Sequence, residues 1–368
     1  MTSFLGAVRD SRKVALITGG AGFIGACLVR RLVGEGIRVV NLDKLTYASN
    51  PASLLPLEGN EDYQFVRGDI TDRHLVQRLF ADTKPDLVFH LAAESHVDRS
   101  IDEPGDFVRT NIVGTFELLE AAYEAWSSYP SGKREAFRFL HISTDEVFGM
   151  LDDEGIFTEK SSYKPSSPYS ASKAGSDHLV RAWHNTYGLP VIVTNCSNNF
   201  GPFQHPEKLI PTVILNAIAG KDIPIYGTGK NIRDWIYVDD HVRGLIAAAE
   251  RGEPGETYLF GGRAERTNES LARSICELLD RWHPNPSGQT YAEQITFVTD
   301  RPHHDFRYAI DPTKSERELG WRIGTSHEEG LEKTVRWYLD MPGAFLQNVG
   351  KLERLGLARM KLRARPAK

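Results

Sequence analysis

The stretch over residues 13–25, K-V-A-L-I-T-G-G-A-G-F-I-G, constrains the fold of this chain more than any other segment. Residues 14–17 form a short apolar run, which is typical of a strand buried on both faces of a parallel sheet. Gly19, Gly22 and Gly25 follow at three-residue spacing, and the stretch also contains the pattern G-x-G-x-x-G. Glycines in this arrangement permit a tight turn and let the backbone approach a pyrophosphate closely.

The segments that follow the glycines support the same interpretation. A helix is expected over residues 23–33, and its free N–H groups and positive end would point at the phosphates. A second strand is expected over residues 37–42, and it leads into Asp43. An acid about 20 residues after the glycines binds the ribose hydroxyls in NAD-binding folds. The alternative is a cluster of turn glycines with a capping Asp, but the whole context favours NAD.

Composition and charge narrow the class of protein. The chain has 368 residues, of which 40% are hydrophobic and 25% charged, as in a soluble protein of one large domain or two ordinary ones. The net charge of −5 gives no reason to expect nucleic acid or a membrane as a partner, and no apolar run has membrane-spanning length. Scattered Cys27, Cys196 and Cys276 indicate reduced thiols and a cytoplasmic location, with no metal site. Residues 1–12 lack a signal-peptide core and are expected to be a disordered lead-in.

Strands and helices alternate along the first half of the chain. Apolar runs and amphipathic spacing predict strands over residues 63–66, 86–91, 137–142 and 191–194, and helices over residues 71–80, 107–127 and 170–187. Repeated βα units predict an α/β fold, a Rossmann-type doubly wound parallel sheet with helices on both faces. Ligands bind at the carboxyl ends of such strands, and the polar clusters of this chain fall there.

The alternation loosens after Asn199. The expected elements are helices over residues 209–219, 242–250 and 268–281, the last capped by Asn268, strands over 224–227 and 233–238, and a loop over 300–311.

Two domains and a tail are expected from this pattern. Residues 13–200 plus 231–262 would form the NAD-binding Rossmann domain, and residues 201–230 plus 263–340 a smaller C-terminal α/β substrate-binding domain. Residues 341–368 form a basic tail, for which a solvated end is expected and a docking role is the alternative.

Tyr169 and Lys173 form a Y-x-x-x-K pair at the start of a predicted helix. Residues four apart share one face of a helix, so both groups would point at one ligand. A lysine cation favours the phenolate and is expected to lower the pKa of the tyrosine towards neutrality. The pair could then take a proton from a substrate alcohol while hydride leaves for NAD. A surface Tyr and Lys would be the alternative outside this nucleotide-binding context.

Thr144, Asp145 and Glu146 form a second cluster, just past a predicted strand. Adjacent carboxylates can serve as acid and base on neighbouring atoms if their environments push their pKa values apart. A turn-capping Asp145 beside a solvated Glu146 is equally compatible with the spacing. An acid/base pair added to an alcohol dehydrogenase suggests elimination.

These motifs together resemble the dTDP-glucose 4,6-dehydratases, which are lyases of the extended short-chain dehydrogenase/reductase superfamily. The resemblance covers about residues 13–337, and its segments are T-G-G-A-G-F-I-G (18–25), L-D-K-L-T-Y-A (42–48), L-A-A-E-S-H-V-D-R-S-I (91–101), S-T-D-E-V-F-G (143–149), S-P-Y-S-A-S-K-A (167–174), T-N-C-S-N-N-F-G-P (194–202), P-E-K-L-I-P (206–211), R-D-W-I-Y-V-D-D-H (233–241) and D-R-P-H-H-D (300–305). The glycines and Y-x-x-x-K belong to the whole superfamily, whereas T-D-E and P-E-K-L-I-P are specific to nucleotide-sugar 4,6-dehydratases.

The resemblance implies an order of events for deoxysugar formation. Tyr169, helped by Lys173 and Thr144, would oxidise the C4 hydroxyl of a nucleotide-linked glucose, with hydride passing to NAD. Glu146 would remove the C5 proton, and Asp145 would protonate the departing C6 hydroxyl. Hydride return to C6 gives the 4-keto-6-deoxy sugar, so NAD is expected to stay tightly bound and to be regenerated in each cycle.

The resemblance also implies binding residues for both ligands. Those implied for NAD are Gly19, Gly22, Phe23, Ile24, Gly25, Asp43, Lys44, Asp69, Ile70, Leu91, Ala92, Ala93, Ser95, Thr110, Tyr169, Lys173 and Asn199. Those implied for the nucleotide sugar are Ser95, Thr144, Asn198, Lys208, Leu209, Pro224, Tyr226, Arg233, Asn268, Arg301, His304 and Tyr308. A homodimer through the helices over residues 107–127 and 170–187 is implied as well.

Several positions depart from the family pattern. Phe148, Phe200 and Phe203 stand where tyrosines are common, His205 stands where Phe is common, and His303 stands where glycine is usual. A site of altered polarity could release the 4-keto sugar before elimination or accept another sugar nucleotide.

Three other functions stay open from the sequence. A UDP-glucose 4-epimerase would share the glycines, Tyr169 and Lys173 but needs no Asp–Glu pair. A UDP-glucose dehydratase shares most of these motifs, so the base of the nucleotide is open. A catalytically silent NAD-binding protein would not need the complete set of Tyr, Lys, Asp and Glu. The pair His303–His304, without further ligands, is expected to be loop histidine rather than a metal site.

Overall fold

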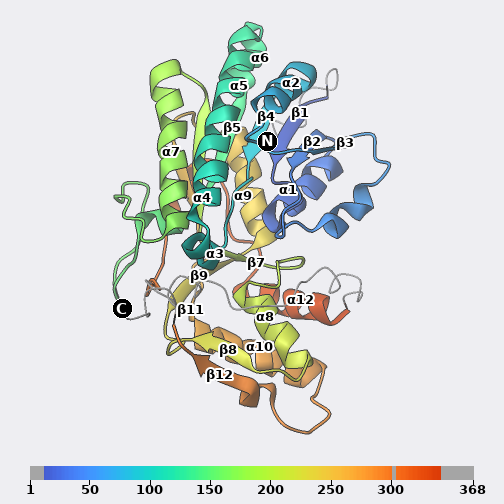
Figure 1. Cartoon of the computed structure of the whole chain (residues 1–368), viewed down its shortest axis with the longest axis vertical. Helices are drawn as coiled ribbons and strands as arrows, with labels where there is room; N and C mark the ends of the chain where they lie inside the picture. The colour runs from blue at the N-terminus through green and yellow to red at the C-terminus, as the bar shows by residue number, and fades with distance from the viewer. Residues whose placement is uncertain (1–11, 301–303, 341–368) are drawn as a thin grey trace, which may run out of the picture.

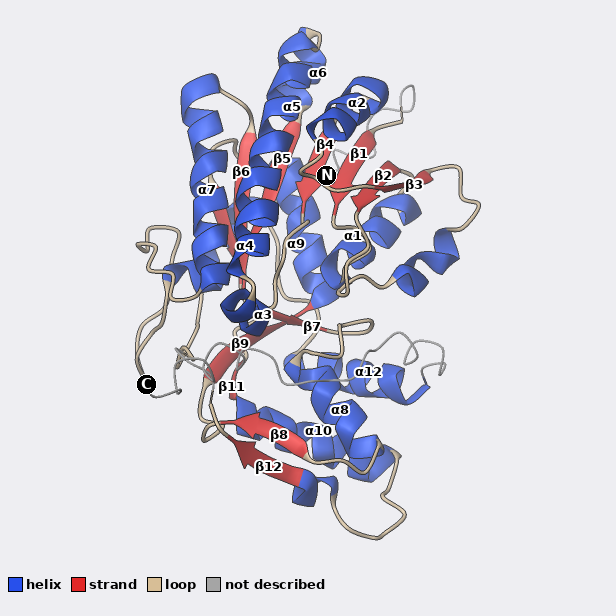
Figure 2. Ribbon diagram, viewed as in Figure 1, coloured by secondary structure: helices blue, strands red, loops and turns tan. Residues whose placement is uncertain are grey.

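The computed structural model describes residues 12–300 and 304–340. Its largest sheet consists of β1 (Val14–Thr18), β2 (Arg38–Asp43), β3 (Tyr63–Arg67), β4 (Leu87–His90), β5 (Arg138–Thr144), β6 (Val191–Cys196) and β10 (Thr257–Phe260). The seven strands lie in the order β10-β6-β5-β4-β1-β2-β3, and all neighbours run parallel (Figures 1 and 2). The chain winds outwards from β1 in both directions, which confirms the predicted doubly wound α/β fold.

Helices cover both faces of this sheet, as Figure 2 shows. The helices of this part are α1 (Phe23–Gly34), α2 (Arg73–Thr83), α3 (Val97–Asp102), α4 (Pro104–Phe107), α5 (Thr115–Ser128), α6 (Ser131–Ala136), α7 (Pro168–Tyr187), α9 (Val238–Arg251) and α11 (Thr313–Leu319), with 3₁₀ turns at Pro51–Leu57 and Asp145–Phe148. Helices α1 and α9 pack on one face, and α2, α5 and α7 pack on the other.

The apolar run of β1 explains why both faces need cover. Ala15 and Ile17 are buried in the core beneath α1 and α9, whereas Leu16 between them is buried in the core beneath α2 and α5. Successive side chains of a strand point to opposite faces, so a continuous apolar run is required when both faces are dry.

A second part of the molecule lies below the large sheet in Figure 1. It contains a three-stranded sheet of β11 (Glu265–Thr267), β9 (Ile232–Tyr237) and β7 (Asn198–Phe200), and a parallel pair of β8 (Ile223–Tyr226) and β12 (Ile295–Val298). Helices α8 (Leu209–Ile218), α10 (Asn268–Trp282) and α12 (His327–Asp340) and a 3₁₀ turn at Tyr291–Gln294 complete it. Its own core is formed around Ile214, Ile275 and Val335. The predicted assignment of residues to two domains stays a prediction.

Two local predictions need correction. The helix expected over residues 107–127 is interrupted, because Val108–Gly114 is a π-helical stretch between α4 and α5. Its Asn111 donates to Glu94 O at 3.0 Å and to Ser172 Oγ at 2.8 Å, which ties the irregular stretch to the site edge and to α7. Helix α10 is capped by Thr267, whose hydroxyl accepts the Ser270 N–H at 3.1 Å, and Asn268 is instead its first residue.

Some predictions fall outside the described residues. These are the lead-in over residues 1–11, the basic tail over residues 341–368, and the assignments of Arg301 and His303. Within residues 12–300 and 304–340, no helix combines the length and apolar character that a membrane span requires.

Replacing Leu16 with Ala tests the central role of β1. Leu16 is fully buried, so we expect Leu16→Ala to lower the free energy of unfolding by about 2–5 kcal/mol, through lost burial and a residual cavity. Leu55→Ala is the matched control, because Leu55 is 56% exposed and its loss should change stability by less than about 0.5 kcal/mol. Urea unfolding measures both values, and equal losses would contradict this description of the core.

Candidate active site

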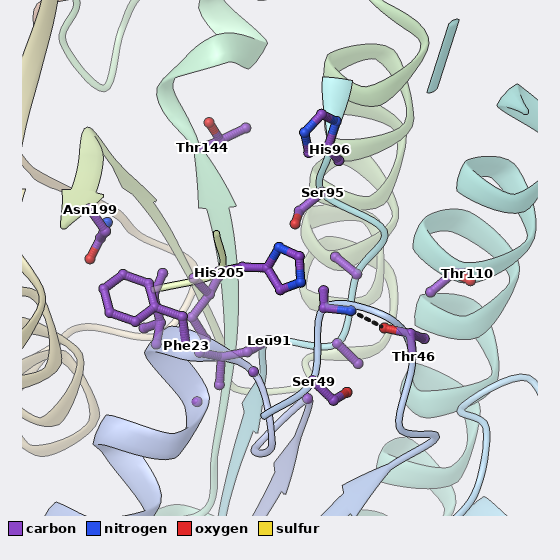
Figure 3. Close-up of a pocket in the computed structure, with 18 of the residues that line it drawn as sticks. Phe23, Thr46, Ser49, Leu91, Ser95, His96, Thr110, Thr144, Asn199 and His205 are labelled. Atoms are coloured by element: carbon purple, nitrogen blue, oxygen red, sulfur yellow. Dashed lines mark hydrogen bonds between the residues drawn. The ribbon is translucent and has the colours of Figure 1, made fainter. Parts of the chain in front are cut away.

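One cavity of about 300 Å³ opens at the carboxyl ends of the central strands. Every residue predicted to bind NAD or to carry the chemistry lines it, namely Gly19, Gly22, Phe23, Ile24, Gly25, Asp43, Lys44, Asp69, Ile70, Leu91, Ala92, Ala93, Ser95, Thr110, Thr144, Asp145, Glu146, Tyr169, Lys173 and Asn199. Figure 3 shows Phe23, Leu91, Thr110 and Asn199 converging on this space from different elements. The roles of the individual residues stay predictions.

The glycine loop forms a close-fitting turn at one end of the cavity. Gly19 has a φ of +74°, and a Cβ on it would lie 2.7 Å from the Ala92 nitrogen, so a side chain is excluded there. A Cβ on Gly25 would lie 2.2 Å from the Gly19 oxygen. At Gly22 the nearest protein atom would be 3.2 Å away, and Gly22 precedes α1 without any side-chain cap. The first N–H groups of α1 are therefore available to an anion, and the loop fits a pyrophosphate.

Asp43 ties this loop to the end of β2. Its Oδ2 accepts the Ala21 N–H at 2.9 Å, and its Oδ1 accepts the Leu45 N–H at 2.8 Å and the Ser49 hydroxyl at 3.2 Å. Ionised carboxylate oxygens offer about four acceptor sites in all, so one remains for a ribose hydroxyl. Asp43 therefore fits the predicted ligand role and also shapes the loop, which sequence reasoning had not identified.

Lys44 joins several of the other predicted NAD residues. Its Nζ donates to Thr110 Oγ1 at 3.1 Å and lies 3.7 Å from Asp69 and 3.3 Å from Glu94. These contacts bring the ends of β2 and β4, the loop after β3 and the π-helical stretch to one side of the cavity.

The sequence folds locally so that Tyr169 and Lys173 enter the cavity from α7. A capping box between Ser167 and Ser170, with Pro168 at the first helical position, fixes where α7 begins. Lys173 Nζ donates to Ile142 O on β5 at 2.8 Å, and burial lowers the pKa of Lys173 to about 8. The predicted convergence of the pair on one space is seen in the cavity lining.

The prediction that Lys173 lowers the pKa of Tyr169 towards neutrality is wrong for the protein without a bound ligand. Burial raises the pKa of Tyr169 well above its ordinary value, and the negative charge of Glu146 raises it further. A hydrogen bond between Tyr169 and Thr144 works to lower this pKa but does not outweigh them. The phenol needs additional positive charge in the cavity to ionise near neutral pH.

Asp145 is in a state suited to an acid. It is 2% exposed, and burial raises the pKa of its carboxyl well above the ordinary range. Glu146 and Asp234 raise this pKa further, while Arg233 lowers it. Burial therefore favours the protonated form of Asp145, which can give its proton to a leaving group. Glu146 beside it is more exposed and lines the same cavity.

The predicted substrate residues divide into two groups. Ser95, Thr144, Asn198 and Lys208 line the cavity, and Lys208 Nζ donates to Ser95 O at 3.4 Å. The cavity lining does not include Leu209, Pro224, Tyr226, Arg233, Asn268, His304 or Tyr308.

Arg233 is the clearest member of the second group. Its guanidinium donates to Ile232 O at 2.7 Å and Asp305 O at 2.8 Å, and it lies over the Tyr308 ring at 4.4 Å. Here the arginine anchors the loop around Asp305, and its predicted contact with phosphate or sugar oxygens stays a prediction.

The departures from the family pattern lie mostly away from the cavity. Phe148 packs against Phe157, Phe200 against Trp235, and Phe203 against Trp337, and none of the three lines the cavity. The three phenylalanine rings therefore do not form part of its walls.

His205 does line the cavity, as Figure 3 shows, and it belongs to a bridge that sequence reasoning missed. Its Nε2 lies 3.0 Å from Tyr47 O, and the Arg99 guanidinium lies 3.6 Å from the centre of the Tyr47 ring. Arg99 in turn pairs with Glu207 at 2.6 Å. The position of Tyr47 shortly after Asp43 was the available sign in the sequence that Tyr47 lies near the site. No spacing rule connects Tyr47 to His205.

Nothing in the described parts of the chain suggests a metal centre. Among residues 12–300 and 304–340 no group of three or more His, Cys, Asp or Glu side chains is arranged to hold a metal ion.

Comparisons with known proteins agree with this site. The family model described as GDP-mannose 4,6 dehydratase matches residues 16–334. A dTDP-glucose 4,6-dehydratase from Xanthomonas campestris pv. campestris is 54% identical over 93% of this chain and 98% of its own. A crystal structure of the dTDP-glucose 4,6-dehydratase DesIV from Streptomyces venezuelae, with NAD and TYD bound, is 44% identical. It superimposes with a TM-score of 0.82 over 91% of this chain and 99% of its own.

A UDP-glucose 4-epimerase from Thermotoga maritima shares the architecture at lower identity. It is 28% identical and has a TM-score of 0.78, over 89% of this chain and 98% of its own. The fold alone is therefore common to several chemistries, and the sequence identity separates them. From the family model and the identity to its curated relatives, this chain belongs to the dTDP-glucose 4,6-dehydratase family of the extended short-chain dehydrogenase/reductase superfamily.

Proposed function

We propose that the protein converts dTDP-glucose to its 4-keto-6-deoxy product, with NAD as a resident cofactor. The observation that carries this proposal is the burial of Asp145, which raises the pKa of its carboxyl, beside Glu146 in the same cavity as Tyr169 and Lys173. An enzyme that only oxidises or epimerises C4 needs no such acid. The names of the relatives and the NAD-bound structure of one of them support the same conclusion.

The glycine loop, the start of α1 and Asp43 would hold the dinucleotide. Bound NAD supplies the site that accepts and returns a hydride, and its oxidised nicotinamide carries the positive charge that Tyr169 needs to ionise. The uncapped N–H groups of α1 would receive the pyrophosphate, and Asp43 would orient a ribose through its hydroxyls.

Tyr169 begins the reaction by taking the proton of the C4 hydroxyl as hydride leaves C4. Lys173 would favour the phenolate through its charge. A hydrogen bond between Thr144 and Tyr169 also works to lower the pKa of the phenol. The C4 carbon becomes a ketone, which makes the adjacent C5 proton acidic.

Elimination then uses the two carboxyl groups. Glu146 takes the C5 proton, and Asp145 gives its proton to the C6 hydroxyl, so that one water leaves from C5 and C6. Glu146 returns a proton to C5 as hydride reaches C6, which completes the 4-keto-6-deoxy sugar.

One proton must still move before the next cycle. Tyr169 has gained the proton of the C4 hydroxyl, and Asp145 has lost one to water. The Thr144 hydroxyl lies 3.3 Å from Asp145 Oδ1 and also bonds to Tyr169. We propose that this hydroxyl carries the proton back from Tyr169 to Asp145.

We also propose a cytoplasmic homodimer. The three cysteines are free, as a reducing compartment requires. Helices α5 and α7 lie side by side in Figure 1, and Val108, Val113 and Tyr187 near them are 50%, 42% and 47% exposed. Exposed apolar residues on adjacent helices offer a surface for a second copy.

Deuterium at C4 of dTDP-glucose distinguishes the possible reactions. We expect the label at C6 of a 4-keto-6-deoxy product, because the hydride taken from C4 is returned within the same active site. Mass spectrometry and NMR of the product locate it. Label returned to C4 would indicate epimerisation, and loss of label from the sugar would indicate oxidation alone.

Glu146→Gln should stop the reaction after oxidation. The amide cannot accept the C5 proton, so we expect reduced cofactor to accumulate on the enzyme and turnover to fall by about 100-fold or more. Absorbance of the reduced nicotinamide follows the accumulation. Glu154→Gln, an exposed position on a loop outside the cavity lining, is the control and should behave as the unmodified protein. Normal turnover by Glu146→Gln would refute the assignment of the C5 base.

A further inference from the structure

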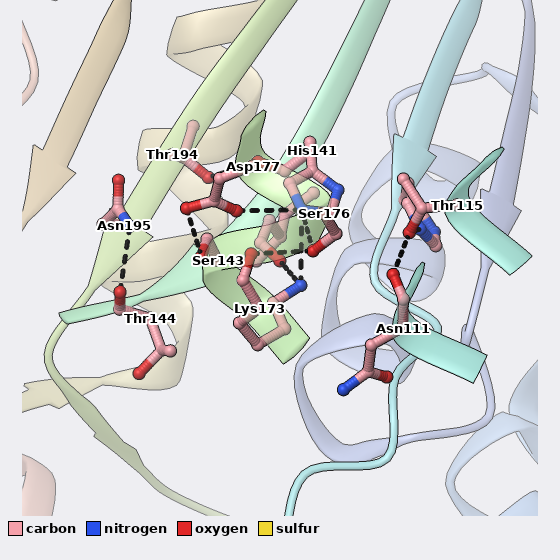
Figure 4. A network of polar contacts seen from close by, with 12 residues as sticks. Asn111, Thr115, His141, Ser143, Thr144, Lys173, Ser176, Asp177, Thr194 and Asn195 are labelled. Atoms are coloured by element: carbon pink, nitrogen blue, oxygen red, sulfur yellow. Dashed lines mark hydrogen bonds and ion pairs between the residues drawn. The ribbon is translucent and has the colours of Figure 1, made fainter. Parts of the chain in front are cut away.

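A fully buried polar network lies directly behind Lys173 (Figure 4). It joins His141 on β5 to Ser176 and Asp177 on α7, and all three side chains are 0% exposed. The chemistry described above uses none of them. A buried carboxylate and imidazole are costly unless partners compensate them, so their place behind a catalytic amine needs a reason.

The direction of the Lys173 ammonium depends on this network. Nζ donates to Ile142 O at 2.8 Å and lies 3.4 Å from His141 Nε2. Both contacts come from β5, and an ammonium has three donor hydrogens. Anchored from behind, Lys173 can present its remaining N–H to the cavity that it lines.

Asp177 supplies the negative charge. Its Oδ2 accepts hydrogen bonds from Ser143 Oγ at 2.9 Å and Tyr163 Oη at 2.8 Å, and its Oδ1 lies 3.1 Å from His141 Nε2. Burial works to raise the pKa of Asp177, but its hydrogen bond with His141 and the positive charges of Lys173 and Arg181 outweigh it. The pKa of Asp177 therefore lies below its ordinary value, and the group is ionised at neutral pH.

His141 separates this anion from the lysine. Burial, together with the charge of Lys173, lowers the pKa of His141 to about 4, so the ring is neutral at neutral pH. Its Nε2 can accept from Lys173 or donate towards Asp177, depending on the tautomer. In the described part of the chain no ion pair joins Lys173 directly to Asp177; the imidazole lies within reach of both.

In the protein without bound ligand, burial shifts the thiol, phenol and imidazole near Lys173 towards their uncharged forms. Burial raises the pKa of Cys196 on β6 to about 12, raises the pKa of Tyr169 on α7 well above its ordinary value, and lowers the pKa of His90 on β4. Asp177 is thus the charged group in the described environment that favours the ammonium form of Lys173.

We propose that His141 and Asp177 are a positioning pair for Lys173, in which Asp177 keeps the ammonium charged and His141 keeps the two charges from pairing directly. Direct pairing would satisfy the ammonium inside the protein and turn it away from the cavity. With the imidazole between them, the lysine retains its charge and faces the ligand. This inference rests on the proposed function, where a charged Lys173 assists Tyr169.

The test follows the oxidation step alone, as the rate of reduced-cofactor formation from dTDP-glucose by Glu146→Gln across a range of pH. Absence of reduced cofactor at every pH would contradict the proposed function before the positioning pair is tested. If it forms, we expect the rate to fall as the pH rises through about 8, because Lys173 loses its proton there. The rate should therefore be sustained below that pH and lost above it.

Two substitutions in the Glu146→Gln background should move the pH at which this rate falls, the alkaline limb of the profile, in opposite directions. Asp177→Asn keeps the shape and removes the charge, so the limb should shift to lower pH by about one unit. His141→Ala removes the spacer and permits direct pairing, so the limb should shift to higher pH while the maximal rate falls about ten-fold or more. Loss of packing alone does not produce opposite shifts. Circular dichroism shows which variants fold. If only one folds, a shift of its alkaline limb in the direction given above supports the positioning pair, and a shift in the other direction contradicts it.

Asp240→Asn in the same background is the matched control. Asp240 is an equally buried aspartate on α9, where it accepts the N–H groups of Gly324 and Thr325 at 3.1 and 3.0 Å. Its loss should lower the unfolding temperature and leave the alkaline limb in place. An unmoved limb in folded Asp177→Asn or His141→Ala, or a shift of the same size in Asp240→Asn, would overturn the positioning pair.

Discussion

The common direction of the central strands is the constraint on which the site depends. Because β1, β2, β4, β5 and β6 run parallel, their carboxyl ends meet at one edge of the sheet. The residues that follow each strand are then brought into one cavity, although they are far apart in the chain. Helices on both faces bury the strands, and their loops are left to carry the polar groups.

Burial then gives similar side chains different tasks. Burial raises the pKa of the Asp145 carboxyl, whereas the pKa of the similarly enclosed Asp177 is lowered by its hydrogen bonds and by nearby positive charges. Lys173 is held near the point of losing its charge. Side chains of the same type on neighbouring strands and helices can therefore act as an acid, a base or an electrostatic support. The environment of each side chain sets its pKa and so its role.

Local patterns were sufficient to predict the parallel fold and the central residues of the site, and the family resemblance added most of the other residues of the cavity lining. The glycines, Asp43 and the Tyr169–Lys173 spacing are short-range signals, and all of them lie where the parallel sheet requires. Contacts between segments far apart in the chain could not be predicted from local sequence patterns. The anchoring of the Asp305 loop by Arg233, and the bridge from Tyr47 to His205, join segments that no spacing rule connects. The raised pKa of Tyr169 was also missed, because burial outweighs a neighbouring charge and a motif does not reveal burial.

The central claim is that Asp145 is the acid that removes the C6 hydroxyl as water. Incubating Asp145→Asn with dTDP-glucose in deuterated water tests it most directly, since the amide keeps the shape of the carboxyl and has no acidic proton to transfer. Glu146 remains able to exchange the C5 proton after oxidation. We expect deuterium at C5 of a sugar that still carries its C6 oxygen, with the 4-keto-6-deoxy product reduced by about 100-fold or more. Formation of that product at the unmodified rate would contradict the claim.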